Sequence, residues 1–134
     1  MGTEIVAQIG EMVGMDVAVI VDLSEDRARA GYANSKKRRD IMFAENLGKA
    51  EAATAAGKWV TATDHHLATR HSDIDVIVDA TGSTRMGAEI AMDAVYNKKH
   101  VVMMNVECDI TVGSFLRKMA DDAGVVYSLA AGDE

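Results

Sequence analysis

The sequence has only one cysteine, Cys108, among its 134 residues. A single cysteine excludes an internal disulfide and fits a reducing compartment, so we expect a cytoplasmic protein. The chain also lacks an apolar run of membrane-spanning length and an N-terminal signal-peptide layout, so we expect no membrane partner. Low-complexity tracts are absent, and a content of 49% hydrophobic and 26% charged residues is typical of a folded soluble domain.

Positive charge is scarce as well. The 14 Lys and Arg residues against 21 Asp and Glu residues give a net charge of −7, which disfavours non-specific binding to nucleic acids. The one basic cluster, Lys36-Lys37-Arg38-Arg39, has no aromatic partners on which bases could stack. We interpret it as the solvated start of a helix and expect no nucleic-acid partner.

One apolar segment, Asp75–Gly82, organises the rest of the sequence. It contains a continuous β-branched run, closes with a Thr-Gly turn and is followed by a helical pattern from Thr84. Such a run is typical of a parallel strand whose two faces are both covered, in a strand-helix-strand unit.

Helices and strands are predicted to alternate along the whole chain. The sequence predicts helices over 1–13, 37–56, 84–97 and 111–123, with shorter ones through Arg27 and Arg29 and after Asp64. It predicts strands over 17–22, 59–63, 75–82, 100–105 and 125–129. This order predicts a single α/β domain with a doubly wound parallel sheet and right-handed crossovers.

The residues that follow each strand are the first candidates for a ligand site, because open parallel sheets bind ligands at the carboxyl ends of their strands. Gly2 and Thr3 begin the first helix, whose free N–H groups suit a pyrophosphate. Asp22 ends the first strand 20 residues after Gly2, the spacing expected of a carboxylate that binds the adenosine ribose. The alternative interpretation is an ordinary chain start and a turn residue.

The choice between NAD and NADP stays open at this point. Asp22 favours NAD, because its carboxylate would accept a hydrogen bond from a free ribose hydroxyl. Ser24, Arg27 and Arg29 follow closely, and a 2′-phosphate requires such donors and cations.

Three segments, Asp75–Gly82, Lys98–Glu107 and Gly124–Ser128, carry a resemblance to a known family. They resemble the cofactor domain of the homoserine dehydrogenase-like NAD(P)-dependent oxidoreductases, and most nearly the deoxyxylulose-phosphate reductoisomerase-like branch whose longer members carry a SAF domain. The resemblance covers essentially all residues. It implies a Rossmann-type NAD(P)-binding domain over residues 1–134.

The resemblance also implies that the sheet is incomplete at its N-terminus. In the family, a strand and a glycine-rich turn precede the first helix, and Met1-Gly2 resembles the end of that turn. The family continues into a substrate domain where this chain stops. We therefore expect a truncated cofactor domain that is inactive alone, and a homo-oligomer formed through the exposed centre of its sheet.

Several site residues are implied by the resemblance. Ala80, Thr81 and Gly82 would contact a ribose of the dinucleotide. Asn105 would lie beside the nicotinamide and the substrate, with Glu107 as its catalytic neighbour. True homoserine dehydrogenases follow this asparagine with lysine, whereas Val106 stands here, which weighs against homoserine as the substrate.

A metal site is the last feature that the resemblance implies. Gly132-Asp133-Glu134 resembles the metal-binding segment of the reductoisomerase. Carboxylates clustered at a strand end suit a hard divalent ion, so Asp133 and Glu134 are candidate ligands for Mg²⁺ or Mn²⁺. A solvated acidic tail is the alternative.

The sequence does not favour nucleophilic catalysis by Cys108 or a histidine metal site. Cys108 follows a strand and precedes a helix, as a nucleophilic cysteine could, but Glu107 and Asp109 would raise the pKa of its thiol. His65, His66 and His71 match no strong metal-ligand spacing, and we interpret them as neutral imidazoles on a surface segment.

The sequence therefore predicts the dinucleotide-binding part of an NAD(P)-dependent oxidoreductase. Its substrate would be a small hydroxy or carbonyl compound or a sugar phosphate. The alternatives are a non-catalytic nucleotide-binding or interaction module, and a truncated product without activity of its own.

Overall fold

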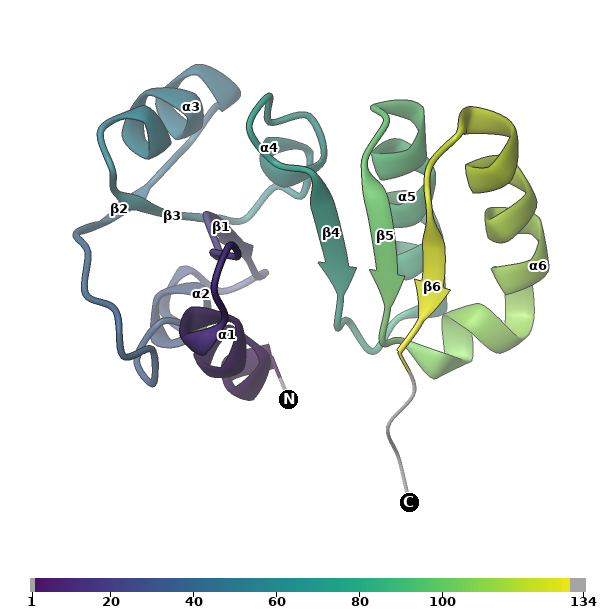
Figure 1. The fold of residues 1–134 in the computed structure, drawn as a ribbon, viewed down its shortest axis with the longest axis horizontal. Helices are drawn as coiled ribbons and strands as arrows, with labels where there is room; N and C mark the ends of the chain where they lie inside the picture. The colour runs from purple at the N-terminus through teal and green to yellow at the C-terminus, as the bar shows by residue number, and fades with distance from the viewer. Residues whose placement is uncertain (1, 131–134) are drawn as a thin grey trace. The chain divides into compact units, whose positions relative to one another are not determined.

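The computed structural model describes residues 2–130, and the chain divides into two compact units between Asp73 and Ile74. The first unit contains α1 (Gly2–Glu11), β1 (Val19–Val21), α2 (Glu25–Ala30), β2 (Ile41–Phe43), α3 (Leu47–Ala55), β3 (Trp59–Ala62) and α4 (His66–Thr69). The second contains β4 (Val76–Asp79), α5 (Thr84–Tyr96), β5 (His100–Met103), α6 (Val106–Ala123) and β6 (Tyr127–Leu129) (Figure 1). All strand pairings are parallel, so the predicted alternating α/β class is confirmed.

The first unit is a three-stranded sheet with helices on both faces. Its strand order is β1-β3-β2, and all four residues of the central strand β3 are buried. One face packs Val60 and Ala62 against Ala50, Ala53 and Leu67 of α3 and α4. The other face packs Trp59 with Val6 of α1 and with Tyr32, which follows α2. This two-faced packing is the doubly wound arrangement that the sequence predicts.

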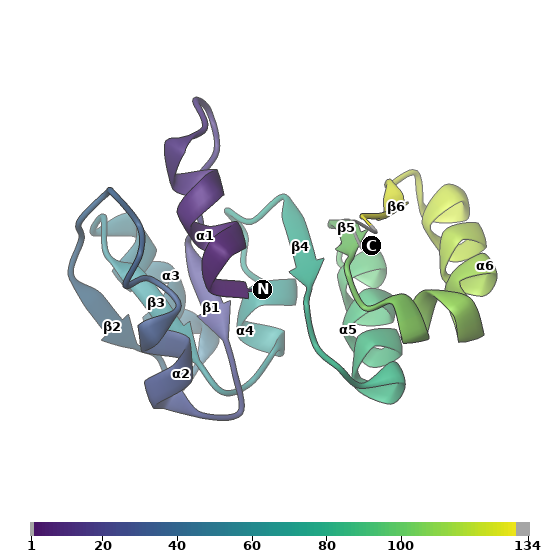
Figure 2. The same cartoon turned by 90° about the horizontal axis from the view of Figure 1, so that it is seen from below.

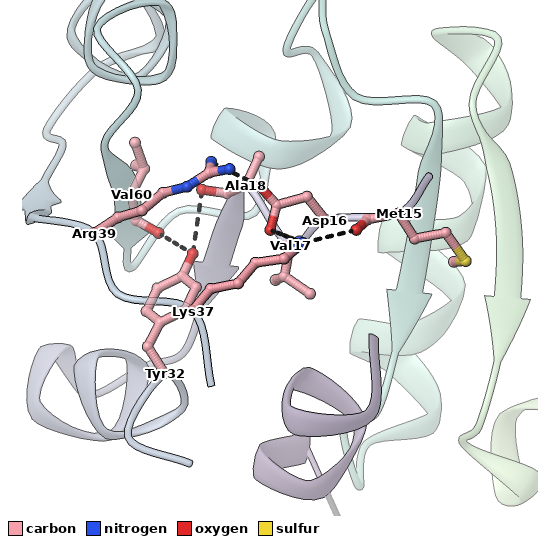
Figure 3. Close-up of polar contacts among 8 residues, drawn as sticks. All are labelled: Met15, Asp16, Val17, Ala18, Tyr32, Lys37, Arg39 and Val60. Atoms are coloured by element: carbon pink, nitrogen blue, oxygen red, sulfur yellow. Dashed lines mark hydrogen bonds and ion pairs between the residues drawn. The ribbon is translucent and has the colours of Figure 1, made fainter. Parts of the chain in front are cut away.

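Tyr32 fastens β1 to β3 within the first unit. Its ring stacks on Trp59 with the centroids 4.4 Å apart and the planes 5° from parallel. Its hydroxyl lies 3.1 Å from the carbonyl oxygen of Ala18 and 3.0 Å from that of Val60 (Figure 3). Burial raises the pKa of Tyr32 above its ordinary value, and the negative charge of Asp16 raises it further. The hydroxyl is therefore a donor to the strand backbone at any ordinary pH.

Asp16, which precedes β1 in the sequence, forms ion pairs with two basic side chains. Arg39 Nη1 lies 2.6 Å from Asp16 Oδ2, and Lys37 Nζ lies 3.9 Å from Asp16 Oδ1. Lys37 also donates to the carbonyl oxygen of Met15 at 3.3 Å, and the backbone N–H of Val17 donates to Asp16 Oδ1 at 3.0 Å (Figure 3). Lys36 also pairs with Glu11 at 2.8 Å, so three of the four residues of the basic cluster form ion pairs within the first unit.

The predicted helix over 37–56 is wrong in its first half. Residues 37–40 are irregular, residues 41–43 form β2, and helix α3 begins only at Leu47. The backbone of Trp59 donates to Asp40 O at 2.8 Å, and Ala44 donates to Thr61 O at 2.9 Å. These long-range bonds to β3 outweigh the local helix propensity. The basic cluster therefore precedes an edge strand and does not begin a helix.

The second unit is a three-stranded sheet with strand order β4-β5-β6. Helices α5 and α6 pack on each other and on one face of this sheet (Figure 2). Ile77, Val101 and Met103 are buried toward them, whereas Val76 and Val78 alternate with Ile77 and are 41% and 38% exposed. The strand predicted within 75–82 is confirmed as β4, and its register to β5 pairs Val76 with His100.

The six strands form two sheets of three in the described part of the chain. Within residues 2–130, β1 forms a ladder only with β3, and β4 only with β5. Each therefore keeps one edge whose backbone groups have no strand partner there. The expectation that a further strand belongs to this fold stays a prediction.

The last helix begins earlier than predicted. The last helix was predicted from residue 111 and begins at Val106, because the side chain of Asn105 caps it. No helix among residues 2–130 is both long enough and apolar enough to cross a membrane.

Candidate functional site

A tight turn at the carboxyl end of β4 presents Ala80, Thr81 and Gly82. Asp79, the last residue of β4, accepts a hydrogen bond from the backbone N–H of Thr81 at 2.9 Å through Oδ1. Asp79 is only 2% exposed, so this contact is shielded from water. Ala80 and Gly82 are exposed and Thr81 is half-buried. The buried carboxylate of Asp79 thus holds the turn, while Ala80 and Gly82 stay exposed.

Asn105 holds the same turn from the end of β5. Its Oδ1 accepts from the backbone N–H of Cys108 at 3.1 Å, which caps α6. Its Nδ2 donates to the carbonyl oxygen of Ser83 at 2.8 Å and lies 3.3 Å from Thr81 Oγ1. Asn105 is 2% exposed. The structure therefore brings the predicted residues Asn105 and Thr81 together, with the amide of Asn105 engaged by the protein itself.

Gly87 allows helix α5 to approach these two polar side chains. A Cβ atom at this position would lie 2.6 Å from Asp79 Oδ2, 2.8 Å from Asn105 Nδ2 and 3.1 Å from Cys108 Sγ. All three neighbours are buried. A side chain larger than hydrogen would therefore displace the residues that hold the turn.

One carboxylate oxygen of the buried residue Asp79 has no hydrogen-bond partner among residues 2–130. Its Oδ2 atom is buried and has no hydrogen-bond partner within the described residues. Two other buried polar atoms, Trp59 Nε1 and Thr61 Oγ1, share this state in the described part of the chain, and an unsatisfied buried carboxylate oxygen is costly. Asp79 was not among the predicted site residues, which included Ala80 to Gly82; the signal that points to it is an acidic residue at the end of a buried strand.

Glu107 lies two residues beyond Asn105, in the first turn of α6. Its side chain is exposed, so its carboxylate is accessible from the same end of β5 that carries Asn105. Negative charge in the first turn is favoured by the helix dipole. The geometry leaves Glu107 available to a ligand while Asn105 is held in place.

Cys108 is a structural thiol in this setting. It is fully buried, and burial raises the pKa of its thiol, with further raising by Asp79 and Asp109. Tyr127 of β6 donates its hydroxyl hydrogen to Asp109 Oδ1 at 2.8 Å. A buried thiol between two carboxylates is a poor nucleophile, which agrees with the interpretation that sets nucleophilic chemistry aside.

Asp22 follows β1 in the first unit. Its backbone N–H donates to Ala62 O at 3.1 Å, which extends the ladder to β3. Its Oδ1 accepts from the backbone N–H of Ser24 at 2.9 Å and pairs with Arg27 Nε at 3.1 Å. Its Oδ2 has no hydrogen-bond partner in the part of the chain that the structure covers. A fixed, half-exposed carboxylate with one unused oxygen is suited to a ribose hydroxyl.

The residues around Asp22 differ in what they can contribute. The Ser24 side chain caps α2 by accepting from the backbone N–H of Arg27. Arg27 is 70% exposed at its side chain and can turn toward a phosphate. Arg29 instead lies with Nη2 3.5 Å from Ile41 O. Of the two predicted cations, Arg27 is the one beside Asp22.

Gly2 and Thr3 begin α1 as predicted. Gly2 is exposed and Thr3 is half-buried. In a helix of 10 residues, the backbone N–H groups of the first turn have no carbonyl partner within the helix, an arrangement that suits an anion.

The predicted metal ligands Asp133 and Glu134 lie outside the described residues, so their Mg²⁺ or Mn²⁺ site stays a prediction. The interpretation of three surface histidines is wrong for His71, which is fully buried. His71 Nδ1 accepts from the backbone of Asp73 at 3.1 Å, and Nε2 lies 3.0 Å from Thr54 Oγ1. These contacts give His71 a structural place beneath α3.

Comparisons with known proteins agree with this geometry. Residues 2–129 match the family described as "Homoserine dehydrogenase, NAD binding domain". A homoserine dehydrogenase from Thiobacillus denitrificans is 30% identical, with a TM-score of 0.51 over 78% of this chain and 23% of that one. No curated protein gave a significant match.

Two further solved structures share the fold at lower identity. A homoserine dehydrogenase from S. aureus is 19% identical, with a TM-score of 0.51 over 78% of this chain and 26% of that one. The apo scyllo-inositol dehydrogenase from Lactobacillus casei is 15% identical, with a TM-score of 0.50 over 84% of this chain and 35% of that one. This chain thus spans between about a quarter and a third of these relatives.

The match over residues 2–129 and the Rossmann-like arrangement of parallel strands and helices together identify the family of the chain. The finer resemblance to the reductoisomerase-like branch stays a prediction. The chain belongs to the family of homoserine dehydrogenase NAD-binding domains.

Proposed function

We propose that this chain binds NAD or NADP and supplies the dinucleotide-binding part of an oxidoreductase that acts on a small hydroxy or carbonyl compound or a sugar phosphate. The nicotinamide would carry the hydride, while the protein binds and orients it. Turnover is assigned to a longer polypeptide that adds a substrate-binding domain. In support, the related solved chains are about three to four times as long as the part that this chain matches.

The observation that carries this proposal is the state of Asp22. Two contacts within the first unit hold Oδ1, and Oδ2 is left for a ligand hydroxyl. The donors and acceptors present fit a dinucleotide: a helix N-terminus at Gly2 and Thr3 for the pyrophosphate, and Asp22 for the adenosine ribose. In the second unit, the open turn Ala80–Gly82 would meet a ribose of the cofactor.

The choice between NAD and NADP depends on Arg27. With NAD, Asp22 would keep its pairing with Arg27 and accept a ribose hydroxyl at Oδ2. With NADP, Arg27 would leave Asp22 and contact the 2′-phosphate, since its side chain is largely exposed. A variant that lacks the Arg27 side chain therefore distinguishes NAD binding from NADP binding.

For the reacting end, we propose different roles for Asn105 and Glu107. Asn105 positions the turn, because its amide already contacts Thr81, Ser83 and Cys108. Glu107 is exposed beside it and would contact the substrate hydroxyl or accept its proton. Since Val106 stands between them, homoserine itself is not the substrate that we propose.

The test is titration of the chain and three variants with NADH and NADPH, followed by cofactor fluorescence. Asp22→Ala should weaken NADH binding by about tenfold, the loss of one or two hydrogen bonds of about 1 kcal/mol each. Asp26→Ala is the matched control, since Asp26 is an exposed acid of the same loop-helix segment and should leave binding unchanged. Arg27→Ala should weaken NADPH binding selectively if NADP is the cofactor. Equal affinities for Asp22→Ala and Asp26→Ala would reject the assignment of Asp22.

The alternative of a non-catalytic nucleotide-binding module makes the same binding prediction. The two hypotheses differ for a polypeptide that contains both this domain and a substrate domain. A non-catalytic module would show no cofactor reduction, with or without the substitution Glu107→Gln. A dehydrogenase would show cofactor reduction that this substitution lowers at least tenfold.

A further inference from the structure

We propose that Asp64, His65 and His66 bind a divalent transition-metal ion, with Zn²⁺ or Ni²⁺ as the suitable class. In the first unit, Asp64 and His65 lie between β3 and α4, and His66 is the first residue of α4. They are distinct from the candidate Mg²⁺ or Mn²⁺ ligands and from the dinucleotide contacts.

The three side chains converge at one point. Each offers one ligand atom, and these atoms all lie within 4.8 Å of one another. Asp64 Oδ1 and His66 Nδ1 are 2.7 Å apart, and the two imidazole centroids are 4.1 Å apart with the planes tilted by 31°. Donor atoms that share an ion through bonds of about 2.0–2.2 Å lie roughly 3–4 Å apart. Small side-chain rotations therefore suffice to place all three around one ion.

The backbone of this segment is already fixed. Asp64 Oδ1 accepts from the backbone N–H of His66 at 2.9 Å, and Leu67 donates to Asp64 O at 3.2 Å. Thr69 donates to His65 O at 3.0 Å. Leu67 is only 5% exposed and packs in the core beneath α3 and β3. A ligand set on a fixed backbone loses little conformational entropy when an ion binds.

The protonation balance allows the ion to enter. His66 Nδ1 and Asp64 Oδ1 share a hydrogen bond in the metal-free protein. Nδ1 of His66 can bind an ion in the tautomer that carries its hydrogen on Nε2, so binding shifts that hydrogen from Nδ1 to Nε2 through solvent. The ion then takes the place of the shared proton between the oxygen and the nitrogen, and no oxidant or reductant is involved.

The donor set selects the class of ion. Two imidazoles and one carboxylate suit Zn²⁺, Ni²⁺ or Cu²⁺, whereas Mg²⁺ requires oxygen ligands and keeps its water. Asp64 and His66 are 56% and 40% exposed at their side chains, so water would complete the coordination. The site would thus be an accessible three-ligand site with remaining positions open.

The test is isothermal titration of the chain with ZnCl₂, NiCl₂ and MgCl₂ in a non-chelating buffer. We expect one Zn²⁺ or Ni²⁺ ion per chain at micromolar affinity, and no Mg²⁺ binding that depends on His65 or His66. His65→Ala and His66→Ala should each lower the affinity at least tenfold. The control is His100→Asn, which keeps an acceptor for the backbone of Val126 and should bind like the unaltered chain.

A second readout locates the ion independently of these variants. Substoichiometric Ni²⁺ should broaden the imidazole NMR signals of His65 and His66 before those of His71 and His100. Unchanged affinity in both His65→Ala and His66→Ala, or initial broadening at His71 or His100, would overturn the proposal. Absence of any Zn²⁺ or Ni²⁺ binding would overturn it as well.

Discussion

Asp79 accepts a hydrogen bond from the backbone N–H of Thr81 at 2.9 Å, and this contact fixes the turn that leaves β4. Its second oxygen, Oδ2, is buried without a partner among residues 2–130. We therefore predict that Asp79→Ala lowers the free energy of unfolding by about 1–3 kcal/mol, the cost of leaving a buried donor unsatisfied. Asp79→Asn keeps an acceptor for Thr81 and should cost less. Urea denaturation measures both, and an equal loss in the two variants would contradict this role of Oδ1.

Gly87 should tolerate no larger residue. In Gly87→Ala, the new methyl group would overlap Asp79, Asn105 and Cys108. We expect a loss of about 1–3 kcal/mol in the free energy of unfolding, even though alanine favours a helix by about 1 kcal/mol.

Gly48→Ala in α3 is the matched control for Gly87→Ala. A Cβ at Gly48 would have only an ordinary contact, 3.5 Å from Asn46 Oδ1, so this variant should be neutral or more stable. If the two alanine variants change the urea midpoint equally, close packing at Gly87 is not the cause.

Tyr32→Phe should destabilise the first unit. The substitution keeps the ring stacking on Trp59 and removes the hydroxyl that donates to Ala18 O and Val60 O. We expect a loss of about 1–2 kcal/mol, observed by tryptophan fluorescence of Trp59 during urea unfolding. An unchanged midpoint would show that the hydroxyl does not fasten β1 to β3.

The stability of the chain should fall at alkaline pH. Burial raises the pKa of Tyr32, with a further contribution from Asp16. Burial also raises the pKa of Tyr127, as does its hydrogen bond to Asp109. The native state thus holds these protons more tightly than the unfolded chain, whose tyrosines titrate near about pH 10.

The stabilisation from the two tyrosines is therefore complete below about pH 10 and is lost as the pH rises above it. Urea unfolding at a series of pH values from about 8 to about 11 measures this loss. Tyr32→Phe should show a smaller decrease across the same range. A stability that rises with pH in this range would contradict the sign of both pKa shifts.

We also predict that the chain self-associates. β4 forms a ladder with β5 alone in the described part of the chain, and its residues Val76 and Val78 remain partly exposed. Free strand edges with apolar side chains favour pairing with a second copy. Light scattering should show a species larger than the monomer, and Val78→Lys should shift it toward the monomer. Leu23→Lys is the control, since Leu23 is 84% exposed on the other unit. A monodisperse monomer would contradict this expectation.

The strands of the second unit could be predicted because their apolar runs are continuous. In β4, the residues Val76 to Val78 are β-branched and apolar on both faces of the strand. The turn Thr81-Gly82 marks the end of the strand. β2 could not be predicted in this way. Its three residues follow charged residues and precede strong helix formers, and its bonds to β3 depend on residues far along the chain.

The site was predictable at the level of segments and not of contacts. Asp22 was predicted from its place after a strand, and Thr81 and Asn105 from the family resemblance; the three residues follow the ends of β1, β4 and β5, and their contacts with a ligand stay predictions. The sequence could not show that Asn105 also donates to the carbonyl oxygen of Ser83, because this contact joins residues 22 positions apart. The burial of His71 was missed for the same reason, since its partner Thr54 lies 17 residues away.

The central claim is that this chain binds a pyridine dinucleotide, and calorimetric titration with NADH and NADPH tests it most directly. We predict saturable binding of one dinucleotide per chain, with a matching rise in the melting temperature. AMP should compete if Asp22 holds the adenosine ribose. The absence of heat and of any thermal shift at millimolar concentrations of both cofactors would contradict the account.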